Sequence, residues 1–205
     1  MNRVDSCQKI IRVDKGQENR MSQGDIYEEI EYIEYAFEKD GYIHISKIIF
    51  PLVIVLTQDC DLEQDALFRN FCGVEGKTQD KILISALVAP IYNADHVFAG
   101  THLDDIHKEH LKALKKEEQS MELINRKRTP GEYLIKNEKC RYHYLEFPTD
   151  VTIVPSIIDF KHYFSVNMEQ MIPMRKEHFV CRVSKLYRED ISLRFANFLS
   201  RIGLP

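Results

Sequence analysis

Several features are missing from this sequence of 205 residues, and each absence excludes a class of protein. No apolar run approaches the roughly 20 residues that a membrane-spanning helix needs. Residues 1–20 contain no apolar core of a signal peptide. Five cysteines, an odd number scattered along the chain, do not form the pattern of a disulfide framework. We therefore expect a reduced, cytoplasmic protein that does not bind a membrane.

An excess of positive charge is missing as well. The formal net charge is −4 and the sequence pI is about 6.1, so no global field attracts the protein to nucleic acid. RNA binding would therefore need a local patch. The hydrophobic content of 44% and the charged content of 29% are those of an ordinary globular protein, and the length fits one domain.

Short strands dominate the expected secondary structure. Alternation at Ile33, Tyr35 and Phe37 precedes an Asp40-Gly41 pair, which is the signature of a tight hairpin. A helix over 26–37 fits the same residues, through Ile26, Ile30, Ile33 and Phe37. Further strands are expected at 51–61, 81–90, 133–135, 140–147 and 151–160. Helices are expected at 62–73, 101–128 and 186–200, the last with Ile191, Phe195, Phe198 and Ile202 on one face.

This pattern predicts an α+β fold, because strands and helices do not alternate as they do in doubly wound proteins. We expect a small β-barrel core at 24–98 after a polar N-terminal tail at 1–23. A helical insertion would follow at 99–128, and the strands and docking helix of 129–205 would complete the same domain.

Three short motifs occur in a recognisable order: "GDIY" at 24–27, "PLVIVLTQD" at 51–59 and "ILISALVAPI" at 82–91. Together they resemble the MazF/PemK-like toxins over about a third of the chain. The resemblance implies an SH3-like barrel and a family that cleaves RNA without a metal. The family's catalytic arginine and its hydroxyl partner fall on Phe50 and Val88 here. Neither side chain can stabilise a phosphorane or move a proton, so the resemblance predicts the barrel without its chemistry.

Asp59, Cys60 and Asp61 form the first candidate site, where a buried strand meets polar residues. In an extended strand the two carboxylates would share a face and could hold Mg²⁺, while Cys60 would point to the other side. The alternative is a solvated strand end with a buried thiol. Cys60 is a poor candidate nucleophile beside two negative charges.

Arg141 and His143 form the second candidate site, a catalytic pair on one face of a strand with Tyr142 and Tyr144 on the other. A cation, an imidazole and aromatic rings suit a phosphate or a stacked base, although an ordinary amphipathic strand is the explanation we prefer. Cys140 and His143 have half of a zinc site's spacing, which Cys60 or Cys72 could complete. Because a second such pair is missing, we predict neither a metal nor a cofactor.

Three functional hypotheses follow. The first is a non-catalytic binding or regulatory module of a toxin–antitoxin or defence system. The second is a ribonuclease with a rebuilt site, using Arg141 and His143, or Asp59 and Asp61 with Mg²⁺. The third is a subunit that depends on a partner, docked through the last helix. The expected partners are RNA, another protein or a second copy in a homo-oligomer. We favour the first hypothesis, because it requires no catalytic group that the sequence does not show.

Overall fold

A computed structural model describes residues 13–14, 20–70, 79–103 and 131–201. Its strands are β1 (Val13–Asp14), β2 (Asp25–Lys39), β3 (Tyr42–Val55), β4 (Ser85–Asn93), β5 (Tyr142–Leu145), β6 (Ser156–Asp159), β7 (Phe164–Asn167) and β8 (Phe179–Val183). Its α-helices are α1 (Asp59–Asn70), α2 (Ala94–Ala99), α4 (Gly131–Ile135), α5 (Met168–Glu177) and α6 (Lys185–Leu199). The 3₁₀ turns are η1 (Gln79–Lys81) and η2 (Phe160–His162). Among the described residues, no helix combines the length and the apolar character needed to cross a membrane.

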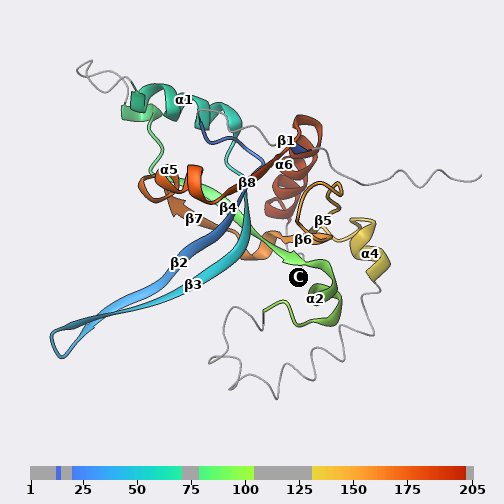
Figure 1. The fold of residues 1–205 in the computed structure, drawn as a ribbon, viewed down its shortest axis with the longest axis horizontal. Helices are drawn as coiled ribbons and strands as arrows, with labels where there is room; N and C mark the ends of the chain where they lie inside the picture. The colour runs from blue at the N-terminus through green and yellow to red at the C-terminus, as the bar shows by residue number, and fades with distance from the viewer. Residues whose placement is uncertain (1–12, 15–19, 71–78, 104–130, 202–205) are drawn as a thin grey trace, which may run out of the picture.

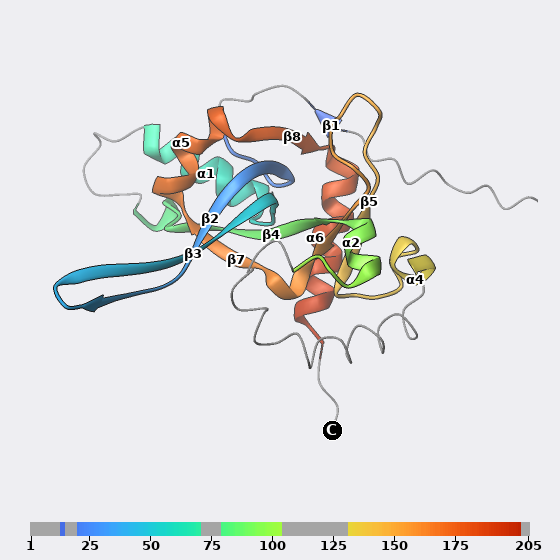
Figure 2. The ribbon, with the colours of Figure 1, turned by 60° about the horizontal axis from the view of Figure 1, so that its bottom comes forward.

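The strands form one curled antiparallel sheet, which confirms the predicted α+β class. Its order is β1-β8-β2-β3-β4-β6-β5, and β7 pairs with β4 beside this path. Figures 1 and 2 show the sheet wrapping as a half-barrel, with α6 against one side and α1 and α5 on the other. The SH3-like type and the division at 24–98, 99–128 and 129–205 stay predictions. Residues 104–130 of the expected insertion lie outside the described residues.

The two faces of the sheet form two large separate cores, as the alternation of strand side chains requires, beside a small third cluster of Ala94, Leu134 and Ile157. One core joins Ile26, Ile54 and Ile91 to Ile191 and Phe195 of α6. The other core lies on the opposite face. It joins Tyr27, Val53 and Val88 of the strands to Leu62 of α1 and Met171 of α5. The predicted helix at 186–200 is therefore confirmed as α6, and it covers one face of the sheet.

The β2–β3 hairpin is the longest feature of the sheet. Asp40 and Gly41 turn with φ of 54° and 78°, so the predicted tight turn is confirmed and the helical alternative for 26–37 is wrong. Among the described strands, β2 and β3 pair beyond the body only with each other, because β8 pairs with Asp25–Tyr27 and β4 with Val53–Val55. Residues 31–49 thus project as a two-stranded ribbon, which we call the arm (Figures 1 and 2).

The expected strand at 133–135 is wrong, because Tyr133, Leu134 and Ile135 belong to the short helix α4. Asn137 ends this helix in the left-handed region at φ 57°. The Asn137 N–H donates to the Leu134 carbonyl and the Glu138 N–H to the Tyr133 carbonyl, each at 3.0 Å, which is the Schellman pattern. This local end signal, rather than the apolar run before it, decides the structure of the segment.

Candidate functional site

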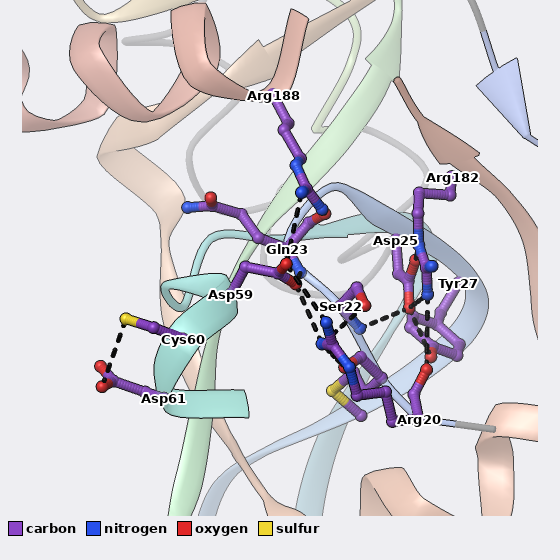
Figure 3. A network of polar contacts seen from close by, with 11 residues as sticks. Arg20, Ser22, Gln23, Asp25, Tyr27, Asp59, Cys60, Asp61, Arg182 and Arg188 are labelled. Carbon is purple, nitrogen blue, oxygen red and sulfur yellow. Dashed lines mark hydrogen bonds and ion pairs between the residues drawn. The ribbon is translucent and has the colours of Figure 1, made fainter. Parts of the chain in front are cut away.

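Asp59, Cys60 and Asp61 form the first turn of α1, and the predicted extended arrangement of these residues is wrong. β3 ends at Val55, and the N–H groups of Asp61 and Leu62 both donate to the Gln58 carbonyl at 3.2 Å. Acidic residues are favourable at this end of a helix, because the helix dipole is positive there. The two carboxylates consequently point in different directions (Figure 3).

The Asp59 carboxylate faces two arginines. Arg20 Nη1 lies 3.1 Å from Asp59 Oδ1, and Arg188 Nη2 lies 3.3 Å from Asp59 Oδ2. The Gln23 N–H also donates to Asp59 Oδ1 at 3.2 Å. Burial by itself raises the pKa of Asp59, but the hydrogen bond from Arg20 and the charge of Arg188 outweigh it and hold the pKa below its usual value. Asp59 is therefore an ionised bridge between two cations.

A second carboxylate, Asp25, lies inside the protein next to this bridge. Arg182 Nε donates to Asp25 Oδ1 at 2.5 Å and Arg182 Nη2 to Asp25 Oδ2 at 3.1 Å. The Ser22 N–H and the Tyr27 hydroxyl donate to Asp25 Oδ2 at 2.8 and 3.3 Å. Burial raises the pKa of the Asp25 carboxyl, although Arg182 acts in the opposite direction. Burial and the Asp25 carboxylate also raise the pKa of the Tyr27 phenol.

We call this set of residues, Arg20, Asp25, Asp59, Arg182 and Arg188, the arginine cluster (Figure 3). It connects segments that are distant in the sequence, because its members come from the stretch before β2, from β2, α1, β8 and α6. Arg182 Nη2 donates to the Arg20 carbonyl at 3.4 Å, which joins the two carboxylate sites. Since both carboxylates lie against arginines, the cluster is suited to hold the fold together rather than to perform catalysis.

Cys60 and Asp61 are exposed and lie apart from the arginine cluster. The Cys60 sulfur lies 3.7 Å from Gln58 Oε1 and from Asp61 Oδ1. With Asp59 turned towards the arginines, the predicted pair of Mg²⁺ ligands does not converge. In the described part of the chain, no group of three or more His, Cys, Asp or Glu side chains is placed to hold a metal ion. Cys72, one proposed zinc ligand, lies outside the described residues.

Arg141 and His143 do not form the shared face that the alternation predicts. Arg141 precedes β5 and pairs with the fully buried Asp159, with Nε 2.8 Å from Oδ1 and Nη2 2.5 Å from Oδ2. Its guanidinium also lies 4.7 Å from the centre of the Tyr142 ring. Burial by itself lowers the pKa of Arg141, but the hydrogen bonds and charge of Asp159 outweigh it and raise the pKa.

His143 points into the core on the other side of β5. The ring is buried, and its centre lies 6.5 Å from that of Phe160. Its Nε2 lies 4.0 Å from Asp190 Oδ2, at the limit of an ion pair. The two residues predicted as a catalytic pair thus occupy separate environments, one beside Asp159 and one beneath α6.

A cavity of about 380 Å³ is lined in part by Ile91, Tyr92 and Asn93 of β4. Its wall combines apolar side chains with two imidazoles, a phenol and a carboxylate, and is formed by Glu28, Pro51, Leu52, Ile91, Tyr92, Asn93, His96, His102, Thr152, Ile153, Val154, Ser156 and Val180. We call it the Tyr92 pocket. Its size falls within the range of about 300–1,000 Å³ that is typical of small-molecule sites.

Tyr92 connects this pocket to Asp159 through His162. His162 Nδ1 lies 3.1 Å from the Tyr92 hydroxyl oxygen and 3.3 Å from Asp159 Oδ2. Burial lowers the pKa of His162, while Asp159 acts in the opposite direction. Burial, together with the charge of Asp159, raises the pKa of the Tyr92 phenol. At neutral pH Tyr92 therefore lines the pocket as a protonated phenol, which suits hydrogen bonding better than proton abstraction.

The positions aligned with the toxin family's catalytic residues lie in the core. Phe50 is 6% exposed, and its ring stacks on Phe164 with 4.8 Å between the ring centres. Val88 is 0% exposed and belongs to the same core. Neither position faces the Tyr92 pocket or the arginine cluster.

Sequence reasoning missed the buried charges that organise these sites, Asp25, Asp159 and Arg182. Each of them lies beside apolar residues at an end of a strand or within it, in "GDIY", "SIIDF" and "FVCRV". A charged residue inside such a run signals a buried ion pair, since an unpaired charge is costly to bury. The sequence alone does not indicate which charges meet.

Comparisons of the chain with protein-family models, with curated proteins and with solved structures found no match. The functional conclusion therefore rests on the residues of this chain.

Proposed function

We propose that the protein is a non-catalytic binding or regulatory module, built on an SH3-like barrel of the MazF/PemK type. The observation that carries this proposal is the burial of Phe50 and Val88 in the apolar core. RNA cleavage through the 2′-hydroxyl requires a cation near the phosphate and a group that moves a proton. Two packed apolar side chains at the matching positions supply neither.

The Tyr92 pocket supports binding as the remaining role. Its wall offers apolar contacts from Leu52 and Ile91 and hydrogen-bonding groups from His96 and Ser156. A mostly apolar cavity with a few polar groups is the usual form of a ligand site. The protonated phenol of Tyr92, which lines this pocket, is consistent with recognition of a ligand.

The rebuilt ribonuclease site is less well supported. Arg141 is neutralised by Asp159, and His143 is buried on the other side of β5. Asp59 lies against Arg20 and Arg188, so it is not available to hold Mg²⁺ together with Asp61. These placements favour the binding module over either version of the enzyme.

A second candidate function, a subunit that depends on a protein partner, is favoured by one observation on α6. Leu186 and Leu193 are both exposed. They are seven residues apart and so lie on the same side of the helix. Such a module could belong to a toxin–antitoxin or defence system, in which its partner would cover this side of α6.

The test is incubation of the purified protein with labelled single-stranded RNA, in Mg²⁺ and in EDTA, with cleavage and retention both measured. We expect no cleavage in either buffer. Cleavage in EDTA that Arg141→Ala abolishes would overturn the proposal in favour of a metal-independent nuclease. Cleavage only in Mg²⁺, lost in Asp61→Asn, would place a metal site at α1. Retention without cleavage would identify RNA as the ligand of the module.

Asp61→Asn and Arg141→Ala need different controls for folding. Asp61 is exposed, so its change leaves the core intact. Arg141 pairs with buried Asp159, so Arg141→Ala is compared with Arg141→Lys, which retains a cation. Circular dichroism of each variant separates lost activity from lost structure.

A further inference from the structure

The arm has two faces of different character, which the strand register defines. Residues paired across the two strands share a face, and neighbours along a strand alternate. One face continues the core outwards and carries aromatic rings, namely Tyr32, Tyr35, Phe37, Tyr42 and His44. The opposite face carries Glu31, Ile33, Ala36 and Glu38 on β2, and Ile43, Ile45, Lys47 and Ile49 on β3. We call it the isoleucine face.

The aromatic face stabilises the ribbon itself. The Phe37 ring stacks on His44 with 5.0 Å between centres, and Tyr35 stacks on Phe37 at 6.0 Å. At the base, Tyr32 packs on Phe164 of β7 with 5.0 Å between ring centres. Such cross-strand contacts are what a two-stranded ribbon needs to hold its shape. The aromatic residues therefore have a role within the monomer.

The isoleucine face has no comparable role within the described part of the chain. Ile33, Ile43 and Ile45 are 57%, 75% and 59% exposed, and Ile49 is 49% exposed. Clustered exposed apolar side chains of this kind mark interaction sites, whereas single ones are common on any surface. The face lies on a ribbon that projects from the body, so another molecule can reach it (Figure 2).

The charges on this face are arranged so that it complements itself. The central row holds Ala36 and Ile45. The next row towards the tip holds Ile43 and Glu38, and the next row towards the base holds Lys47 and Ile33. Each of these two rows thus has one isoleucine and one charge, and the charges are of opposite sign.

We propose that the isoleucine face is the contact surface for a second copy of this chain, packed antiparallel about a two-fold axis over the central row. This arrangement places the tip row of each arm on the base row of the other. Ile45 then packs on Ile45 of the second copy, and Ile43 lies near Ile33 of that copy. Glu38 lies diagonally opposite Lys47 of the second copy. Because the axis is two-fold, every contact off the axis occurs twice.

The antiparallel direction also fits the shape of the molecule. The arm projects from the sheet with its tip away from the body, so antiparallel arms carry the two bodies at opposite ends (Figures 1 and 2). Lys47 Nζ lies 2.5 Å from Glu31 Oε1 of its own chain. The approach of Glu38 from the second copy gives this lysine a second carboxylate. The acidic excess of the arm, Glu31, Glu34, Glu38 and Asp40 against Lys39 and Lys47, disfavours RNA and anionic membranes as occupants.

Sedimentation velocity of the full chain over a range of concentrations tests this proposal. We expect a species of twice the 24.1 kDa of one chain. Ile45→Glu places two like charges at the axis and should raise the dimer dissociation constant by roughly tenfold or more. Tyr42→Ser on the aromatic face is the matched control, because it removes another exposed side chain near the tip and should leave association unchanged.

A charge exchange tests the register of the contact. Glu38→Lys and Lys47→Glu should each weaken the dimer by about fivefold, as expected for exposed ion pairs that occur twice. The double variant should dissociate less readily than Lys47→Glu alone, because both lose the pair with Glu31 and only the double variant regains the contact between copies. A double variant no tighter than Lys47→Glu would overturn this register.

Three results would overturn the proposal as a whole: a monomer at every concentration, a dimer unaffected by Ile45→Glu, or RNA retention that this variant abolishes. Association of two arms does not depend on the absence of catalysis. Sedimentation reports association whether or not RNA is cleaved, so the failure of one proposal is distinguishable from the failure of the other.

Discussion

Asp25 and Arg182 place opposite charges side by side where the protein otherwise buries apolar side chains. The carboxylate accepts from the guanidinium, from the Ser22 N–H and from the Tyr27 hydroxyl, so its oxygens are well supplied with donors. A buried ion pair contributes little net stability compared with apolar residues of the same size, but removing one partner is costly. At the residue scale, the fold therefore depends on both members being present.

Asp25→Asn should lower the free energy of unfolding by about 3–5 kcal/mol, because it deprives the buried Arg182 of its carboxylate. Urea unfolding followed by circular dichroism measures the change. Asp61→Asn is the control, since this exposed carboxylate on α1 should change stability by no more than about 0.5 kcal/mol. The double variant Asp25→Leu/Arg182→Met should lose less unfolding free energy than Asp25→Asn. Equal effects of Asp25→Asn and Asp61→Asn would contradict this role for the buried pair.

Asp59 gives a prediction about pH. Its pKa in the folded protein is below the reference value of 3.8. Burial favours the protonated acid, but Arg20 and Arg188 stabilise the carboxylate by more. The ionised group therefore stabilises the fold above pH 3.8, and this contribution is lost as the pH falls through the folded-state pKa. The unfolding free energy of wild type should exceed that of Asp59→Asn by about 1 kcal/mol at neutral pH, since the site is partly exposed. The difference should shrink below pH 3.8. A difference that widens on acidification would contradict the assignment.

At the element scale, local signals predict some elements and long-range contacts decide others. The β2–β3 turn is predictable because Asp40 and Gly41 adopt its conformation by themselves, and α6 because its apolar residues recur at helical spacing. The start of α1 is not predictable in this way, because polar and apolar residues alternate in "QDCDL" as they do in a strand. Its helix is supported by distant partners: Asp65 accepts from the Leu83 N–H at 2.7 Å, and Arg69 Nη1 lies 2.6 Å from Glu169 Oε1. The pairing of Arg141 with Asp159 likewise joins residues whose strands meet only in the folded sheet.

Gly24 and Gly41 separate two costs of replacing a glycine. Their φ angles are nearly equal, at 82° and 78°, so an alanine meets similar backbone strain at both positions. A Cβ at Gly24 would lie 3.1 Å from the Cβ of Arg188 and 3.4 Å from the Val183 carbonyl oxygen, whereas nothing lies within 4 Å at Gly41. Gly41→Ala should therefore cost about 1 kcal/mol of unfolding free energy. Gly24→Ala should cost about 1–2 kcal/mol more, because α6 or β8 must also shift. Equal costs in urea unfolding would show that the junction of β2, β8 and α6 is looser than the structure indicates.

At the scale of the whole molecule, the body and the arm should be energetically separate. The two cores use residues of the sheet, α1, α5 and α6, while the arm beyond Tyr32 and Ile48 contributes mainly exposed side chains. The bulge between Ile33 and Tyr35 marks where the ribbon leaves the regular register of its base. Local stability should accordingly fall along the arm, since no other described strand pairs with its outer edges.

Shortening the arm tests this separation. Tyr32 and Ile48 face each other across the hairpin, so residues 33–47 can be replaced by Asn-Gly, which forms a two-residue turn between paired positions. The shortened protein should fold, with an unfolding free energy within about 2 kcal/mol of wild type measured in its monomeric state. Ile30→Ala, just inside the body at a fully buried position of the same strand, should cost about 2–5 kcal/mol in the same measurement. A shortened protein that fails to fold, or that loses more unfolding free energy than Ile30→Ala does, would show that the arm belongs to the folding unit. If it folds and also fails to dimerise, the arm is an appendage whose exposed isoleucines serve contacts between molecules.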